Sequence, residues 1–212
     1  AQDGDRAYVH CRPSTNLCDL GFEALTTALT EAGAAGLDVG EDLSDLSPYR
    51  LLFIFPLTQE LPEPDLDAVV AYYAAGGTVV GAAEASNYNG IAISNINDVT
   101  SALGLGLLYY FKSYDAYCGH VATVIPGHPL TKGVASLGYH WSCAVTGNTI
   151  LATGNSGQDL VAVKDRFVAA ADSSIFTDQC DAWQNRPFFE NLWRTTYDQG
   201  GDGVIDVEDK CA

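Results

Sequence analysis

The last stretch of the chain carries acidic side chains at a spacing that suits a bound cation. Residues 198–211 read DQGGDGVIDVEDKC, which places Asp198, Asp202, Asp206 and Asp209 three or four positions apart. Carboxylate oxygens are the hard ligands that calcium prefers, and a glycine directly after Asp202 lets the chain turn around the ion. These four side chains therefore predict a calcium site. The alternative is an acidic, solvated tail that happens to contain Asp-Gly.

Two other carboxylates follow apolar runs that are typical of strands. Glu84 comes two positions after the run TVVGA, and Asp172 comes directly after RFVAAA. Ligands bind beyond the carboxyl ends of strands in an open parallel sheet, so both side chains are candidates for a catalytic base or a ligand. Each has a structural alternative, in which it caps the turn that follows it. Because the sequence offers no second catalytic group at a defined spacing, the structural alternative is favoured.

The cysteines predict disulfide bonds. The nearby histidines leave a zinc site open as the alternative. However, the six cysteines contain no Cys-x-x-Cys pair and so lack the paired short spacings of such a site. Proximity along the chain suggests three pairs, of which only the first has close spacing. The predicted pairs are Cys11–Cys18, Cys118–Cys143 and Cys180–Cys211.

The elements that must position these groups begin with alternating strands and helices. A helix over residues 20–33, with Asp19 as its N-cap, follows a strand over residues 6–11. A helix that begins near Asp65 ends at Gly76-Gly77, directly before the apolar run Thr78–Ala82. A short strand is also expected over residues 37–39, and a strong one over residues 49–56. Apolar strands joined by helical crossovers predict a parallel, doubly wound sheet.

The second half of the chain has a different pattern. Asn-rich loops follow Asn87, a helix is expected over residues 96–103, and a final helix over residues 186–196. Between them, short apolar runs separated by glycine predict an antiparallel meander at one edge of the sheet, with residues 159–171 as its last hairpin. The predicted strands cover residues 107–111, 120–125, 136–144, 149–152, 160–163 and 166–171.

Length, composition and charge limit the classes of function. The 212 residues include 27 acidic and 10 basic side chains, and the net charge of −17 argues against nucleic acid or membrane insertion as partners. No apolar run reaches the ~20 residues that a membrane-spanning helix needs. The sequence has no methionine, opens with AQDGD and contains six cysteines. We therefore expect an exported chain, secreted or at the cell surface, whose leader has been removed.

Residues 1–196 resemble the class I glutamine amidotransferase-like family. The matching segments are LLFIFP, AVVAYYAAGGTVVGAAEA, GHPLTKGV and VAAADSSIFTD with NRPFFENLW. The resemblance implies an α/β, doubly wound, mainly parallel flavodoxin-like sheet. Catalytic members carry a cysteine in a G-x-C-x-G elbow. Here Ala83 stands in its place, and the partner His-x-Glu is missing, so the resemblance implies a domain without amidotransferase activity.

Residues 197–212 resemble a thrombospondin type 3 calcium repeat, DxDxDGxxDxxDxC. The match departs at Gly200, where the repeat has its second aspartate, which removes one carboxylate from the implied calcium site. The resemblance implies a short C-terminal calcium-loop tail after the α/β domain. It also implies that this chain is part of a larger bacterial surface protein, because such repeats usually occur in series.

The predicted function is that of an exported, non-catalytic binding or assembly domain, stabilised by calcium and disulfides. Its partner would be another protein, a glycan or a second copy of the chain. One alternative is an extracellular hydrolase that uses Glu84, Asp172 or a histidine at the strand ends. Another is a self-assembling structural subunit of a filament or surface layer.

Overall fold

The structure is a computed structural model that describes residues 4–11, 18–114, 118, 120–147, 149–179 and 182–196. The four predicted calcium ligands, Asp198, Asp202, Asp206 and Asp209, lie outside the described residues. The same holds for Cys180 and Cys211.

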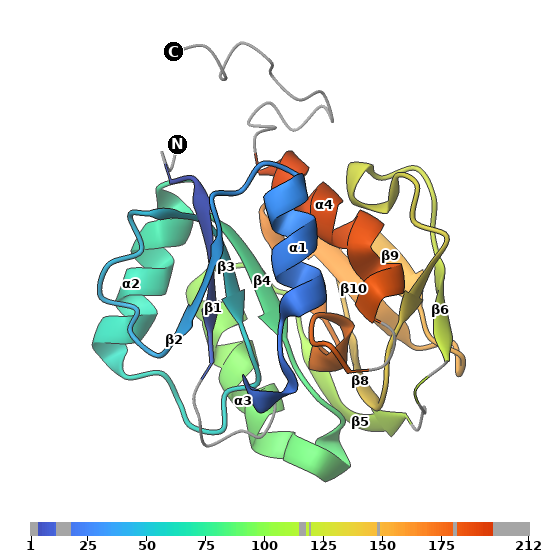
Figure 1. Cartoon of the computed structure of the whole chain (residues 1–212). Coiled ribbons are helices and arrows are strands. Elements are labelled where there is room, and N and C mark those ends of the chain that lie inside the picture. The colour runs from blue at the N-terminus through green and yellow to red at the C-terminus, as the bar shows by residue number, and fades with distance from the viewer. Residues whose placement is uncertain are drawn as a thin grey trace.

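A nine-stranded sheet forms the centre of a mixed α/β fold (Figure 1). Five neighbouring strands in it are parallel, in the order β2-β1-β3-β4-β11. They are β2 (Leu37–Gly40), β1 (Arg6–His10), β3 (Tyr49–Ile54), β4 (Thr78–Ala82) and β11 (Phe167–Ala170). All five residues of β4 are buried, as expected for a strand with a neighbour on each side and helices on both faces.

The other half of the sheet is antiparallel and continues in the order β10-β9-β6-β7. These strands are β10 (Asp159–Lys164), β9 (Thr149–Thr153), β6 (Val121–Val124) and β7 (Ser136–Gly138). The predicted hairpin over residues 159–171 is confirmed by the pairing of β10 with β11. A separate two-stranded sheet pairs β5 (Tyr109–Tyr114) with β8 (Ser142–Val145).

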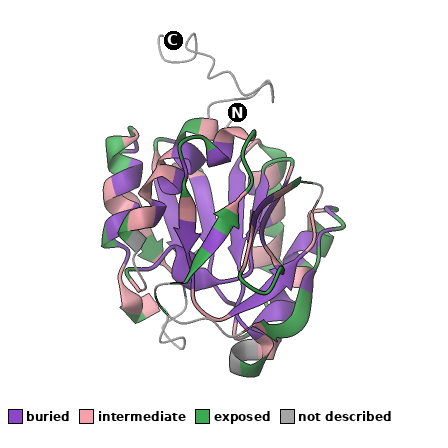
Figure 2. Ribbon diagram, turned by 90° about the vertical axis from the view of Figure 1, so that its right-hand side faces the viewer, coloured by how far each residue is buried: buried purple, intermediate pink, exposed green. Residues whose placement is uncertain are grey.

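Helices cover both faces of the central sheet, and Figure 2 shows the buried strands between them. In Figure 1, α1 (Glu23–Glu31) and α4 (Arg186–Thr195) lie side by side in front of the sheet. On the far side, α2 (Glu63–Ala74) contacts α3 (Ser86–Ala102). Short 3-10 helices are η1 (Cys18–Leu20), η2 (Pro129–Thr131), η3 (Ser173–Ile175) and η4 (Ala182–Asn185). Among the described residues, no helix is both long and apolar enough to cross a bilayer.

An aromatic cluster packs α4 against the sheet. Phe176 is fully buried and its ring contacts four other phenylalanines, two from the β3 region and two from α4. The centroid distances from Phe176 are 5.5 Å to Phe53, 6.3 Å to Phe55, 6.4 Å to Phe188 and 5.9 Å to Phe189. The cluster joins the carboxyl end of β3 to the last helix of the domain.

The outer edge of β7 is closed by one side chain. Asn185 Oδ1 accepts a hydrogen bond from Gly138 N at 2.7 Å, and Asn185 Nδ2 donates to Gly138 O at 3.0 Å. The same Nδ2 also donates to Ile175 O at 2.9 Å, and Asn185 is fully buried. The amide thus binds both backbone groups of Gly138, as a further strand would do.

Two predictions about helices need correction. The prediction of Asn-rich loops after Asn87 is wrong, because α3 already begins at Ser86. Its asparagines tie the helix to its neighbours, since Asn95 Nδ2 donates to Leu57 O at 2.7 Å and Asn97 bonds both N and O of Tyr109. These tertiary contacts outweigh the low helix propensity of asparagine.

The predicted N-cap of the first helix is also wrong. The helix begins at Glu23, and the carboxylate at its N-terminus belongs to Asp178 instead of Asp19. Asp178 accepts hydrogen bonds from Glu23 N at 2.7 Å and from Ala24 N at 2.9 Å. The cap therefore comes from a distant part of the chain. Similarly, the single strand expected over residues 136–144 is two strands, β7 and β8, which belong to different sheets.

Candidate functional site

The structure brings Glu84 and Asp172 together at the carboxyl ends of the parallel strands. β4 and β11 are neighbours, and Ala82 lies opposite Ala170 in their register. Glu84 and Asp172 each come two positions after these paired residues, so both carboxyl groups leave the sheet at the same edge. The prediction that each follows a strand is confirmed.

Asp172 is fully buried and accepts hydrogen bonds from three donors. His140 N donates to its Oδ2 at 2.5 Å, and Ser174 donates through N to Oδ1 at 2.9 Å and through Oγ to Oδ2 at 2.5 Å. The bonds from Ser174 show that Asp172 caps the turn at η3, which is the structural alternative stated for it. Burial raises the pKa of Asp172, and these donors oppose that rise.

Glu84 is also buried, and its contacts lead to the residue next to Asp172. Its Oε1 accepts hydrogen bonds from Ser173 Oγ and, at 3.3 Å, from Ser173 N. Burial is the main cause that raises the pKa of Glu84 well above its ordinary value of 4.5, and the carboxylate of Asp172 raises it further. Asp172 accepts more hydrogen bonds than Glu84, and hydrogen bonds to a carboxylate favour its ionised form. We therefore assign the ionised form to Asp172 and the protonated form to Glu84.

Cys143 lies beside this pair, which corrects one predicted disulfide. Its thiol is free and fully buried, and Sγ donates to Ala171 O at 3.4 Å, so the Cys118–Cys143 pair is wrong. Burial is the main cause that raises the pKa of the Cys143 thiol, and the neighbouring carboxyl groups of Glu84 and Asp172 also disfavour a thiolate there. The Cys11–Cys18 disulfide is confirmed, with a Cα–Cα distance of 5.8 Å. Cys118 is disulfide-bonded as well.

The turn after β4 contains no accessible nucleophile. Ala83 is fully buried, and Ala83 N donates to Ala170 O at 3.0 Å. Gly81 is packed so closely that a Cβ there would lie 2.6 Å from Phe167 Cζ and 2.9 Å from the Tyr109 hydroxyl. The segment is therefore filled with side chains from β11 and β5, and its carboxylate is engaged by Ser173.

The histidines do not gather into a metal site in the described part of the chain. There, no three His, Cys, Asp or Glu side chains are placed to hold a metal ion. His128 Nδ1 accepts from Leu130 N at 3.2 Å and so caps η2. His140 contributes its backbone N to Asp172, while its ring stacks on Trp141 with centroids 5.8 Å apart.

Several residues of this cluster were not predicted. Ser173, Ser174 and the backbone of His140 supply the donors that make two buried carboxyl groups tolerable. The only sequence signal for them is the run Asp-Ser-Ser, which is typical of a turn and says nothing about a partner 89 residues away at Glu84.

Comparisons with known proteins show similarity of fold. No family model and no curated protein matches the chain. The mmIFT52 N-terminal domain matches with a TM-score of 0.68 at 12% identity, over 95% of this chain and 98% of that one. A ThuA-like protein from Parabacteroides merdae matches with a TM-score of 0.59 at 18% identity, over 95% and 91%.

Part of a longer enzyme is similar as well. A catalytic mutant of Gan42B, a GH42 β-galactosidase from G. stearothermophilus, matches with a TM-score of 0.52 at 16% identity. The match covers 89% of this chain but 29% of the enzyme. At such identities the similarity concerns the fold alone, and the chemistry must be argued from the residues present.

Replacing Glu84 with glutamine is expected to change how stability depends on pH. The pKa of Glu84 is raised in the folded protein. The stability that the protonated Glu84 contributes to the wild type is therefore complete below the unfolded pKa of about 4.3, and it is lost as pH rises through the folded pKa. In that window the wild type should lose about 1.4 kcal/mol per pH unit relative to Glu84→Gln. Urea unfolding of both proteins from pH 4 to 8 measures this difference.

A matched control removes an exposed carboxylate. Asp98 lies on the exposed side of α3, and Asp98→Asn makes the same carboxylate-to-amide change there. The difference between this variant and the wild type should stay constant over the same pH range. A constant difference for Glu84→Gln too would contradict the assignment of a protonated Glu84.

Proposed function

We propose that this chain is a non-catalytic binding or assembly domain of amidotransferase-like, flavodoxin-like fold. The observation that carries the proposal is the filled turn after β4. Ala83 has no reactive atom and is fully buried, and Glu84 is buried against Ser173. A substrate would meet neither a nucleophile nor an exposed base at the place where this family has its chemistry.

The range of similar structures supports a role as a module. The mmIFT52 N-terminal domain is matched over 98% of its chain, whereas the β-galactosidase is matched over 29% of its length. The same fold thus occurs in a domain of this size and as a minor part of a long enzyme. That distribution fits a unit whose contribution is to bind or to assemble.

The rival function is a hydrolase that uses the paired carboxyl groups. One observation favours it, namely that the structure brings Glu84 and Asp172 together. The Gan42B β-galactosidase, which is similar over part of its length, is a glycoside hydrolase. A panel of chromogenic glycosides and esters, assayed with the wild type, Glu84→Gln and Asp172→Asn, separates the two functions. No turnover above the buffer is expected. Turnover that is lost in both variants and kept in Asp98→Asn would overturn the binding proposal.

We further propose that the acidic tail binds calcium and stabilises the exported protein. Calcium that binds only the folded state raises its stability by about 2.7 kcal/mol when the ion is at a hundred times its Kd. Thermal melts in calcium and in excess chelator should therefore differ for the wild type. The shift should disappear in Asp202→Ala and Asp206→Ala and remain in Asp98→Ala. Equal melting temperatures in both buffers would reduce the tail to an acidic linker.

The partner proposed for this domain is another protein, a glycan or a second copy. Size-exclusion chromatography with light scattering, with and without calcium, tests the last of these. A mass that corresponds to several copies in calcium would favour self-assembly into a filament or surface layer. A single copy in both buffers would leave a different protein or a glycan as the proposed partner.

A further inference from the structure

The short connection between β7 and β8 contacts one member of the buried carboxyl pair, Asp172. Residues 139–141 lead from the nine-stranded sheet to the two-stranded sheet. His140 N donates to Asp172 at 2.5 Å, whereas Tyr139 N reaches His120 O at 3.4 Å. The bond to Asp172 is thus the shorter of these two backbone contacts. Trp141, the last residue of the connection, is half-buried, and its Nε1 has no hydrogen-bond partner among the described residues.

The groups that face the pair supply little positive charge. Glu84 precedes α3 and Asp172 follows β11, while β8 contributes the Cys143 thiol and β5 the buried phenol of Tyr109. His140 is the titratable side chain of the connection itself, and a positive charge on it would lower the pKa of Asp172, after the hydrogen bonds from Ser174 and from the His140 amide. On the neighbouring strands, β10 begins with the carboxylate of Asp159, and β3 ends in apolar residues. Among the described residues, no salt bridge of a lysine or arginine includes Glu84 or Asp172.

We propose that Glu84 and Asp172 form a proton-dependent latch on the β7–β8 connection. With one proton between them they hold this connection closed, and loss of the proton to water at rising pH releases His140 and Trp141, while Tyr139 stays buried and the sheet stays folded. The latch adds a regulatory element to the domain and does not depend on which partner it binds.

The physical reason is that two neighbouring carboxyl groups cannot both be ionised while both stay buried away from water. Two like charges at low dielectric repel strongly, and water must reach at least one of them. Glu84 is attached to β4 and α3, and β4 is hydrogen-bonded on both sides by β3 and β11. Asp172 instead holds His140 through one backbone bond. Tyr139 has its own anchors, because its ring is fully buried and its hydroxyl accepts a hydrogen bond from Asn155 N at 2.8 Å. Hydration of Asp172 therefore breaks the bond to His140 and frees His140 and Trp141 at lower cost than opening the sheet.

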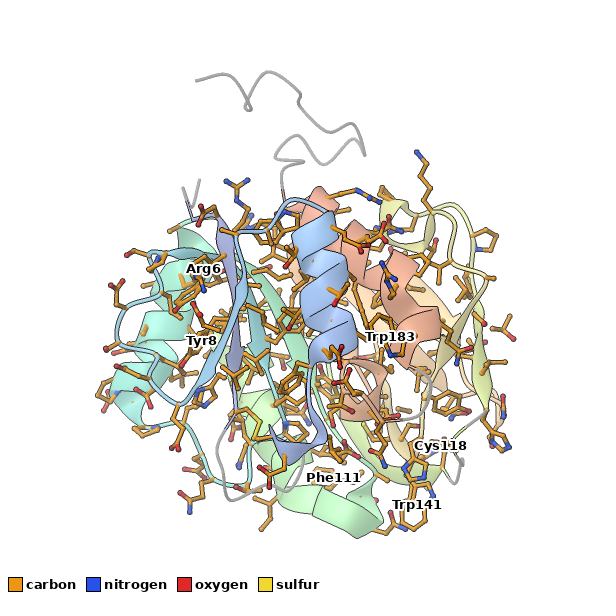
Figure 3. The ribbon with its side chains drawn as sticks, in the orientation of Figure 1. Arg6, Tyr8, Phe111, Cys118, Trp141 and Trp183 are labelled. Carbon is orange, nitrogen blue, oxygen red and sulfur yellow. A yellow bond between two sulfur atoms is a disulfide. The ribbon has the colours of Figure 1, made fainter. Side chains whose placement is uncertain are left out.

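Trp141 makes the release measurable. Figure 3 shows Trp141 at the end of the molecule opposite Arg6, on the side where the parallel strands end. Tryptophan fluorescence of the wild type and of Trp141→Phe, recorded from pH 4 to 9, isolates the emission of Trp141 by difference. Far-UV circular dichroism at each pH reports whether the whole domain remains folded.

The expected result is a red shift of Trp141 emission as pH rises, in the wild type and in Asp98→Asn, with unchanged circular dichroism. Glu84→Gln cannot lose the proton, so its emission should stay constant over the same range. The proposal is overturned by a shift that persists in Glu84→Gln, by the lack of any shift in the wild type, or by a shift that accompanies loss of circular dichroism.

Hydrogen exchange on the wild type keeps the test independent of any variant. After correction for the intrinsic dependence on pH, the His140 amide should lose protection at least tenfold between pH 5 and 8. The amides of Val168 and Ala169 in β11 should keep theirs, because the sheet stays paired on both sides of that strand. An equal loss at all three amides would show global opening and would contradict the latch.

Discussion

Replacement of Phe176 by alanine is expected to lower the free energy of unfolding by about 3–5 kcal/mol. The side chain is fully buried, and its ring contacts Phe53 and Phe55 near the sheet and Phe188 and Phe189 on α4. Alanine would leave a cavity where four rings lose a common partner. That loss is a large share of the 5–15 kcal/mol that stabilises a typical domain.

Chemical and thermal unfolding both measure this effect. The expected fall in melting temperature is roughly 6–20 °C for a chain of this size. Phe111→Ala is the matched control, because the same ring is 62% exposed at that position on β5. It should cost less than about 1 kcal/mol. Similar losses for the two variants would show that the cluster around Phe176 is not the joint between α4 and the sheet.

Asn185→Ala is expected to have the second-largest effect. Its side chain binds Gly138 N, Gly138 O and Ile175 O, and all three backbone groups would lose a partner in a buried place. Each unsatisfied buried group costs about 1–3 kcal/mol, so the total loss should be about 3 kcal/mol or more. Urea unfolding gives this value directly.

Two further variants test whether the amide itself is required. Asn185→Asp keeps the size and the acceptor for Gly138 N but loses the donor to Gly138 O and Ile175 O. We expect it to be nearly as unstable as alanine, because it also buries a charge. Asn155→Ala removes an exposed asparagine from a turn and should change stability by less than about 0.5 kcal/mol. A stable Asn185→Asp would contradict the role of the donated hydrogen bonds.

The first half of the fold could be predicted because its signals are local. Gly76-Gly77 and the run Thr78–Ala82 mark a helix end and a buried strand, and α2 and β4 lie there. The start of α3 could not be predicted, because Asn95 and Asn97 are stabilised in the helix by Leu57 and Tyr109. Likewise, the cap of α1 comes from Asp178, 155 residues after Glu23.

The site was predictable in position and only partly in role. A carboxylate at or just beyond the end of an apolar run can be located by pattern, so Glu84 and Asp172 were found. That they meet depends on β4 and β11 being neighbours, which no local pattern specifies. The free thiol of Cys143 was missed for the same reason, since proximity along the chain does not place β8 beside Ala171. The calcium ligands stay a prediction.

The place of β4 in the sheet has a consequence for synthesis of the chain on the ribosome. β4 pairs with β3, which precedes it closely, and with β11, which is made only after residue 166. Until then, an apolar strand has one open edge, and such edges invite pairing with other chains. The β10–β11 hairpin therefore closes the nascent domain. Fragments that end before it should be the ones that aggregate and require chaperones.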